Sequence, residues 1–317
     1  MRELYETDYE KLNKCPWCGE QSSASKILYV DDLNCPIVKC NNCGIIYAKN
    51  RLNSSGLDKY WEDYETRVHV ADKKLTEERQ VMYKIDFDFV KPYLDNLAKH
   101  MSAINVLDIG CGNGEFLNYF EDYGCKTEGV EFGKKAAELA EQHHIIHYGE
   151  FDKMDFGDKE YDLVIFRGVL QYIPYPKEYL KKAKSILSEG GYIFITAQPN
   201  LDSLAARLFG KNFRLSVTGT DFIGYNEKVL TEYMKSENLD KVGERYFYPE
   251  TPYANEEEDL MLMAKALKNK QENKIIDFKS PAFWGNMMTL VYKKQIGYQS
   301  SKLNIGKHHE KYNRKIY

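Results

Sequence analysis

The stretch VLDIGCGNGEF, residues 106–116, decides the expected fold of this chain of 317 residues. It is a short apolar run that ends in Gly110, Gly112 and Gly114 and leads into a helical pattern. A glycine-rich turn lets the backbone approach a ligand closely, and the helix behind it offers unpaired N–H groups. The stretch therefore predicts the first strand and the ligand-binding turn of an open α/β sheet.

Strand-like apolar runs and helical patterns alternate from residue 104 onward. Strands are expected at 104–109, 125–131, 145–148, 161–166, 192–197, 241–248 and 286–294, and helices at 114–124, 133–144 and 176–191. This alternation is typical of a parallel sheet that helices cover on both faces. A further helix, 255–269, begins with acidic residues and lies in an expected insertion, 249–285, ahead of the last strand.

Four of the seven cysteines form two Cys-x-x-Cys pairs, Cys15 with Cys18 and Cys40 with Cys43. Four soft thiolates favour tetrahedral Zn²⁺, and a site without an open coordination position is structural. A redox pair is the alternative, but the second pair and the absence of a thioredoxin-like strand pattern disfavour it. We therefore expect a structural zinc ribbon in which these four cysteines are the ligands.

The net charge of −4 and the even mixture of charged residues disfavour a nucleic-acid partner. No apolar run is long enough to span a membrane, and the polar N-terminus lacks the apolar core of a signal peptide. Unpaired cysteines without a secretion signal favour a reducing compartment. The expected location is the cytoplasm.

The glycine turn departs from the dinucleotide fingerprint G-x-G-x-x-G, because Glu115 stands in place of the third glycine. Asp108 adds a second acid beside the turn, and two acids would repel a pyrophosphate. A ligand with positive charge fits better, and S-adenosylmethionine carries a sulfonium and an ammonium group. Glu131, at the end of the second strand, can accept hydrogen bonds from both hydroxyls of a ribose.

The segments VLDIGCGNGEF, TEGVE, YDLVIFRGVLQYI and SILSEGGYIFITAQPN follow one another in the order typical of one family. Residues 75–295 resemble the class I S-adenosylmethionine-dependent methyltransferases. The resemblance implies a Rossmann-like seven-stranded sheet flanked by helices, with the last strand antiparallel and inserted beside the others. It also implies S-adenosylmethionine as the cofactor.

The resemblance assigns positions around this cofactor. The first acid and the glycines shape the methionine end, Glu131 holds the ribose, the residues after the third strand lie beside the adenine, and those after the fourth line the reacting methyl. The expected cofactor-binding residues are Asp108, Gly110, Cys111, Gly112, Glu131, Phe132, Glu150, Phe151, Phe166 and Arg167. Cys111 can be read as a nucleophile, but a small residue within this turn is expected to pack.

Two residues are candidates for the chemistry. Many relatives carry Glu-His where this chain has Gln171 and Tyr172, so a histidine base is absent from this position. Tyr172 either orients or deprotonates a hydroxyl, or it packs against the cofactor. Asp221 lies in a region that covers the substrate in relatives, and it is either a base or hydroxyl acceptor, or the cap of a turn.

The segment between the cysteines and the sheet is expected to be helical. Val81, Ile85, Phe89 and Tyr93 recur at a spacing of four and predict one apolar helix face. Tyr60, Trp61 and Tyr64 precede this helix and form either a lid over the cofactor or ordinary packing. The aromatic stretches 245–253 and 280–286 are expected to line the same cleft.

Four regions follow from these patterns: a zinc ribbon at 1–52, a helical linker or lid at 53–100, the methyltransferase domain at 101–297 and a polar tail at 298–317. A zinc ribbon ahead of this core resembles methyltransferases that modify sugars, antibiotics and capsules. The expected acceptor is a hydroxyl or a carbon of a nucleotide-linked sugar, or of another small precursor of a surface polysaccharide or secondary metabolite.

Two alternatives stay open. An RNA methyltransferase that docks through its zinc ribbon is one, although the first ninety residues or so lack the basic patches expected of it. A non-catalytic binding protein that keeps only the cofactor fold is the other. The non-catalytic alternative is disfavoured because the chain retains Asp108, the glycine turn and Glu131.

Overall fold

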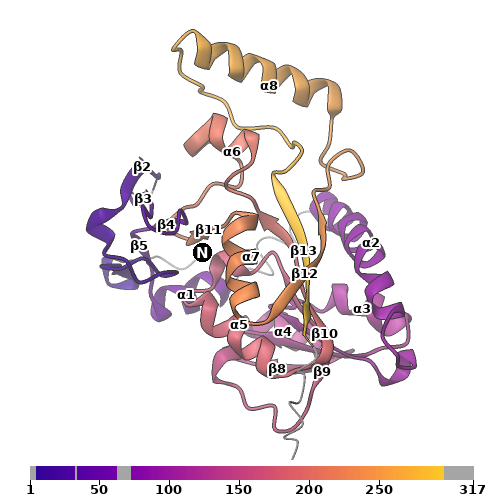
Figure 1. Cartoon of the computed structure of the whole chain (residues 1–317). Coiled ribbons are helices and arrows are strands. Elements are labelled where there is room, and N and C mark those ends of the chain that lie inside the picture. The colour runs from indigo at the N-terminus through magenta and orange to yellow at the C-terminus, as the bar shows by residue number, and fades with distance from the viewer. Residues whose placement is uncertain (1–4, 33, 63–72, 296–317) are drawn as a thin grey trace, which may run out of the picture.

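The computed structural model describes residues 5–32, 34–62 and 73–295. Its centre is a seven-stranded sheet in the order β12–β13–β10–β9–β6–β7–β8 (Figure 1). The strands are β6 (Asn105–Ile109), β7 (Lys126–Glu131), β8 (Ile145–Tyr148), β9 (Tyr161–Arg167), β10 (Leu187–Pro199), β12 (Leu239–Arg245) and β13 (Met287–Lys294). All seven expected strands are confirmed, although β10 begins at Leu187, within the stretch 176–191 that was expected to be helical. The last strand, β13, lies antiparallel between β10 and β12, as the resemblance implied.

Helices cover both faces of this sheet because side chains of each buried strand alternate between two apolar clusters. One cluster receives side chains from α2 (Lys73–Asp95), α3 (Glu115–Asp122) and α4 (Lys134–Ala140), and the other from α5 (Pro176–Ser185) and α7 (Glu227–Ser236). Within the described residues, no helix has the length and apolar character that a membrane crossing requires.

The N-terminal part forms what we call the cysteine module, residues 5–52. Its strands are β1 (Tyr9–Lys11), β2 (Lys26–Val30), β3 (Pro36–Lys39), β4 (Ile46–Ala48) and β5 (Asn50–Leu52), and α1 (Ser54–Glu62) follows. β1 pairs with β5, while β2, β3 and β4 form a second sheet that β11 (Ile223–Gly224) completes. Because β11 belongs to the loop after β10, the module and the main domain share one sheet.

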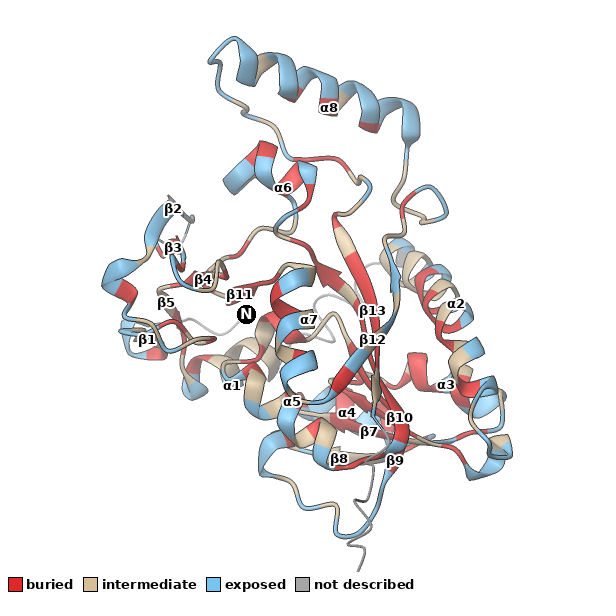
Figure 2. Ribbon diagram, viewed as in Figure 1, coloured by how far each residue is buried: buried red, intermediate tan, exposed pale blue. Residues whose placement is uncertain are grey.

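An extension carries α8 (Glu256–Gln271) across α6 (Leu204–Phe209), away from the central sheet (Figure 1). Most of α8 is exposed, and a narrow stripe with Met263 and Ala266 is buried (Figure 2). Short 3-10 helices complete the fold at Glu6–Asp8, Ser22–Ala24, Met101–Ala103, Phe151–Lys153 (η5), Leu170–Tyr172 (η6) and Gly210–Asn212.

The helix expected around residues 81–93 is confirmed as α2. Phe89 and Tyr93 of the expected apolar face pack partly buried against the core, but the most buried face of α2 is a neighbouring one. Val81 is 46% exposed, whereas Tyr83, Phe87 and Val90 are buried. The fully buried Asp86 shares their face, where its carboxylate binds Arg167 and accepts a hydrogen bond from Thr196. The charged Asp86 interrupts the apolar pattern of the buried face. The neighbouring stripe that begins at Val81 is therefore the more regular apolar pattern in the sequence.

The burial of Asp86 generates a stability prediction with a control in the same helix. Asp86→Ala leaves the Arg167 charge without its partner, so the free energy of unfolding in urea should fall by about 3–5 kcal/mol. Asp88→Ala removes the exposed pair with Lys84, and we expect a change under about 0.5 kcal/mol. Equal effects of the two substitutions would contradict the assigned face of α2.

Candidate active site

A cavity of about 490 Å³ opens where β6, β7 and β9 end. Ligands of open α/β sheets bind at this carboxyl edge. The cavity wall contains every expected cofactor residue except Phe166, namely Asp108, Gly110, Cys111, Gly112, Glu131, Phe132, Glu150, Phe151 and Arg167. Parallel strands therefore bring together residues that are widely separated in the sequence.

Close packing explains the glycines of the turn. Gly110 and Gly114 have positive φ angles of 73° and 83°. A Cβ at Gly110 would lie 2.7 Å from Cγ2 of Val169, and one at Gly114 would lie 2.9 Å from Cδ2 of His144. A larger residue at either position would therefore meet both backbone strain and a clash.

The Cys111 side chain is buried, and a Cβ at Gly129 of β7 would collide with its sulfur. Burial, with the nearby charges of Asp108 and Glu131, raises the pKa of the Cys111 thiol well above its ordinary value. A protonated thiol is a poor nucleophile. Of the two interpretations of Cys111, packing is therefore favoured.

Asp108 lies on the cavity wall and is only 2% exposed. Its Oδ1 finds no hydrogen-bond partner among the residues that the structure describes. Burial raises the pKa of Asp108 to about 8, although Arg167 opposes the shift, and Glu131 adds to it. A buried carboxyl without a partner fits a ligand that brings a cation or N–H donors.

Glu131 connects two turns around the cavity. Its carboxylate accepts hydrogen bonds from the backbone N–H groups of Gly112 at 2.8 Å, Phe132 at 2.8 Å and Gly133 at 2.6 Å. Burial raises the pKa of Glu131 despite these three bonds. A carboxylate has about four acceptor sites and these bonds use three of them, so Glu131 can also accept a bond from a hydroxyl of a ligand.

Two arginines, Arg79 and Arg167, line the same cavity, and of these only Arg167 was expected there from the sequence. Arg167 donates from Nε to Asp86 at 2.9 Å, and its guanidinium lies 4.4 Å from the ring centre of Tyr83. Arg79 of α2 has a buried Nη1 without an acceptor in the described chain. No motif marks Arg79 in the sequence, and only the fold of α2 against the sheet places it on the cavity wall.

The two candidate catalytic residues meet in the structure. Tyr172 lies on the cavity wall in η6, and Asp221 lies behind it, outside the wall. Burial raises the pKa of Asp221, against hydrogen bonds from the hydroxyls of Thr218, at 3.0 Å, of Tyr172 and of Thr220. Asp221 therefore closes a local turn and lies beside the Tyr172 hydroxyl.

Tyr60 and Trp61, which the sequence assigned either to a lid or to ordinary packing, both belong to α1. Trp61 of α1 lines the cavity, and its ring meets Tyr172 edge to face at 5.0 Å between centres. Tyr60 packs against Trp61 at 5.1 Å. Tyr64 falls outside the described residues. Leu57 and Asp58 of the same helix also line the cavity, so α1 forms one of its walls.

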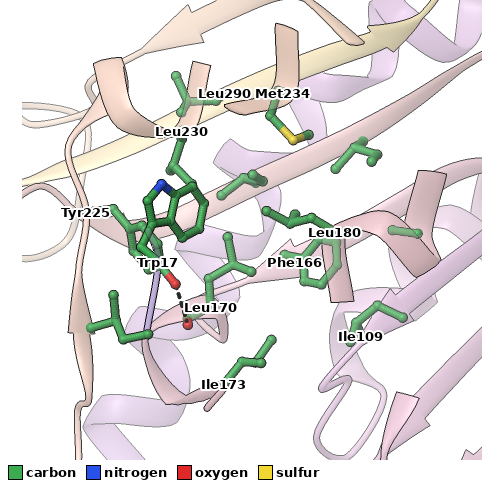
Figure 3. Packing of buried hydrophobic residues seen from close by; sticks show 14 of the residues in the cluster. Trp17, Ile109, Phe166, Leu170, Ile173, Leu180, Tyr225, Leu230, Met234 and Leu290 are labelled. Atoms are coloured by element: carbon green, nitrogen blue, oxygen red, sulfur yellow. Dashed lines mark hydrogen bonds between the residues drawn. The ribbon is translucent and has the colours of Figure 1, made fainter. Parts of the chain in front are cut away.

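Two expectations about the wall do not match the structure. Phe166 is fully buried in the core below the cavity, because it points to the opposite face of β9 from Arg167 (Figure 3). The stretches 245–253 and 280–286 contribute no residue to the cavity wall. Instead, Tyr248 packs on Trp284 at 4.4 Å and donates to Asp259 of α8 at 2.6 Å.

The four cysteines of the two pairs form a cluster that fits a metal ion. Their sulfur atoms all lie within 4.8 Å of one another, with 3.7 Å between Cys15 and Cys43 and 3.5 Å between Cys18 and Cys40. Tetrahedral zinc with Zn–S bonds of about 2.3 Å places sulfurs about 3.8 Å apart. A disulfide would need about 2.05 Å. The donor set and its spacing suit Zn²⁺.

Comparisons with known proteins point to a family. A family model described as "Methyltransferase domain" matches residues 78–243, and the match begins after the cysteine module. A ubiquinone biosynthesis O-methyltransferase of Shewanella halifaxensis is 24% identical over 134 residues, 39% of this chain and 57% of that protein. An uncharacterised protein of Methanocaldococcus jannaschii is 29% identical over 139 residues, 44% of this chain and 58% of that protein.

The chain thus spans a little over half the length of these curated relatives. Among solved structures, a Thermotoga maritima protein described as a SAM-dependent methyltransferase, possible histamine N-methyltransferase, aligns with a TM-score of 0.50. It is 18% identical, and the alignment covers 74% of this chain and 99% of that chain. At this identity, the likeness supports the fold.

The buried Asp108 predicts a pH dependence of cofactor binding. Below a pH of about 8 the Asp108 carboxyl of the ligand-free protein is mostly protonated. A cationic ligand favours the ionised form of this carboxyl. The affinity for S-adenosylmethionine should rise with pH toward about 8 and level off above it, and binding at neutral pH should release a proton. Calorimetry in buffers of different ionisation enthalpy measures that release. In Asp108→Asn the dependence should vanish, and its persistence would assign it to another group.

The cysteine cluster predicts one zinc ion per chain, measurable by elemental analysis of protein purified without chelator. Cys40→Ser removes one ligand and should lower the zinc content strongly. Cys35→Ser is the matched control, because Cys35 is buried in the same module but donates to the carbonyl of Asn50. Zinc loss in both variants, or in neither, would contradict the assigned ligands.

Proposed function

This chain belongs to the methyltransferase-domain family, and on that premise we propose that it transfers the methyl group of S-adenosylmethionine to a small acceptor. The main supporting observation is a pair of buried polar atoms on one cavity wall, Oδ1 of Asp108 and Nη1 of Arg79, each without a hydrogen-bond partner among the described residues. An amino-acid moiety with an ammonium and a carboxylate satisfies both groups.

In the proposed complex, each residue meets one part of the cofactor. Asp108 binds the ammonium of the methionine end, and Arg79 binds its carboxylate. Glu131 accepts a hydrogen bond from the ribose, and Phe151 and Glu150 flank the adenine. Arg167 and the residues after it face the methyl group.

Bound S-adenosylmethionine supplies an electrophilic methyl group together with its own leaving group. The chain has to align the acceptor for in-line displacement and remove its proton. In our proposal Tyr172 takes the proton of an acceptor hydroxyl while it passes its own proton to Asp221. The raised pKa of Asp221 favours that acceptance.

For the acceptor we propose a nucleotide-linked sugar, or another small precursor of a surface polysaccharide or secondary metabolite. Support comes from the aromatic side chains Trp61, Tyr172 and Tyr175 on the cavity wall, since aromatic faces stack on sugar rings. The free cysteines agree with a cytoplasmic location. The regions expected at 1–52, 53–100, 101–297 and 298–317 remain our division of the chain, with structural zinc in the first.

Label transfer from methyl-labelled S-adenosylmethionine tests this proposal. The protein is incubated with cell extract divided into small molecules, RNA, and protein with polysaccharide. Label in nucleotide sugars or polysaccharide is expected, and Tyr172→Phe should lower the rate a hundredfold or more.

Controls separate the alternatives. Asp108→Asn provides the background for a chain with an impaired cofactor site. Label in RNA above that background would favour the RNA methyltransferase that docks through its ribbon. A wild-type protein without affinity for S-adenosylmethionine would favour the non-catalytic binding protein.

A further inference from the structure

Three backbone carbonyls of one active-site loop, residues 168–175, are held by groups that lead to the cysteine module. This loop carries Tyr172, and Tyr172, Ile173, Pro174 and Tyr175 all line the cavity. The three carbonyls belong to Leu170, Gln171 and Pro174. Two of the donors, Tyr225 and Phe222, flank β11, and the third, Arg51, belongs to β5.

The first connection begins between two of the zinc ligands. Trp17 stands between Cys15 and Cys18, yet its ring is buried in the core of the main domain, 5.6 Å from that of Tyr225. The Tyr225 hydroxyl donates to the carbonyl of Leu170 at 3.2 Å, as Figure 3 shows. The metal-binding turn therefore packs one tyrosine away from the loop.

The second connection runs through backbone groups alone. The N–H of Ala48 in β4 donates to the carbonyl of Phe222 at 2.9 Å, and the N–H of Phe222 donates to the carbonyl of Gln171 at 2.9 Å. Asp221 precedes Phe222, and Tyr172 follows Gln171. The module's sheet thus ends directly at the two candidate catalytic residues.

Arg51 of β5 makes the third connection, and its side chain is fully buried. Its Nε donates to Glu10 at 2.6 Å, and its Nη1 donates to the carbonyl of Pro174 at 2.6 Å. The guanidinium also lies 4.9 Å from the ring centre of Tyr175. Burying a guanidinium costs desolvation free energy, and two of the groups that this one contacts, the Pro174 carbonyl and the Tyr175 ring, belong to the loop.

We propose that the cysteine module is a structural clamp on the active site and that Arg51 is a positioning residue, which holds the Tyr172 loop through Pro174. The module also supplies part of the wall itself, through Glu10 and Leu52. The inference rests on the proposed function only in taking S-adenosylmethionine as the ligand that occupies the cavity. It predicts that metal binding and cofactor binding are coupled, rather than serving two independent domains.

Variants of Arg51 in the full chain test the clamp. Arg51→Met removes the contact to Pro174, and we expect S-adenosylmethionine to bind roughly tenfold more weakly in calorimetry, with zinc content unchanged. Arg51→Lys retains a charge and a donor and should recover part of the affinity. Arg245→Met is the matched control, because Arg245 also pairs with a glutamate, Glu250, and lies 4.9 Å from an aromatic ring, but outside this cavity.

A spectroscopic readout reports the loop without any ligand. Trp61 is one of three tryptophans and contacts Tyr172, so its fluorine NMR signal in fluorotryptophan-labelled protein senses the loop. Arg51→Met should shift or broaden this signal, and Arg245→Met should not. If Arg51→Met fails to fold, zinc is instead removed from the wild type by a chelator, with the same change expected and reversed when zinc is restored.

Outcomes for the clamp and for the proposed function are separate. Wild-type affinity and an unchanged Trp61 signal in Arg51→Met, or in the zinc-free protein, would overturn the clamp. A wild type that does not bind S-adenosylmethionine would overturn the proposed function, and the Trp61 signal would still decide the clamp.

Discussion

Parallel pairing of β6 with β7 on one side and β9 on the other is the constraint on which the rest of the structure depends. Asp108 is opposite Gly129 of β7 and Ile165 of β9, so the three strands end at one edge. Parallel strands need crossover connections, and each connection here leaves that edge in a turn. The glycine turn, the Glu131 turn and the Tyr172 loop are therefore neighbours whatever their separation in the sequence.

Two polar side chains at this edge, Asp108 and Arg79, each have a buried atom without a hydrogen-bond partner among the described residues. Buried side-chain atoms without a partner occur in Arg51, Arg79, Asp108, Gln171, Gln198 and Asn286. Native proteins leave few such atoms, because each lost hydrogen bond raises the free energy of the folded state. Two of these residues, Asp108 and Arg79, line the same cavity, which is the pattern expected of a site that a polar ligand completes.

The cysteine module illustrates how a small, metal-stabilised unit can become part of a larger core. Alone, it has few apolar residues to bury, and metal ligands commonly replace a core in units of this size. Here Trp17 and Tyr47 join the main apolar cluster, and β11 extends the module's sheet. A unit that looks separate in the sequence is thus continuous with the main domain in space.

The sequence by itself determined the seven strands, the glycine turn, the acids beside it and the four clustered cysteines, because periodicity and spacing are local properties of the chain. Only the tertiary structure decided which face of α2 is buried. On that face Asp86 forms an ion pair with Arg167. The tertiary structure also decided that Arg79 lines the cavity and that Arg51 is buried against the Tyr172 loop. Asp221 comes to lie beside Tyr172 in the same way. Phe166 and the stretches 245–253 and 280–286 lie away from the cavity for the same reason. Each of these depends on contacts between distant segments, and no local pattern encodes which distant partner a side chain will meet.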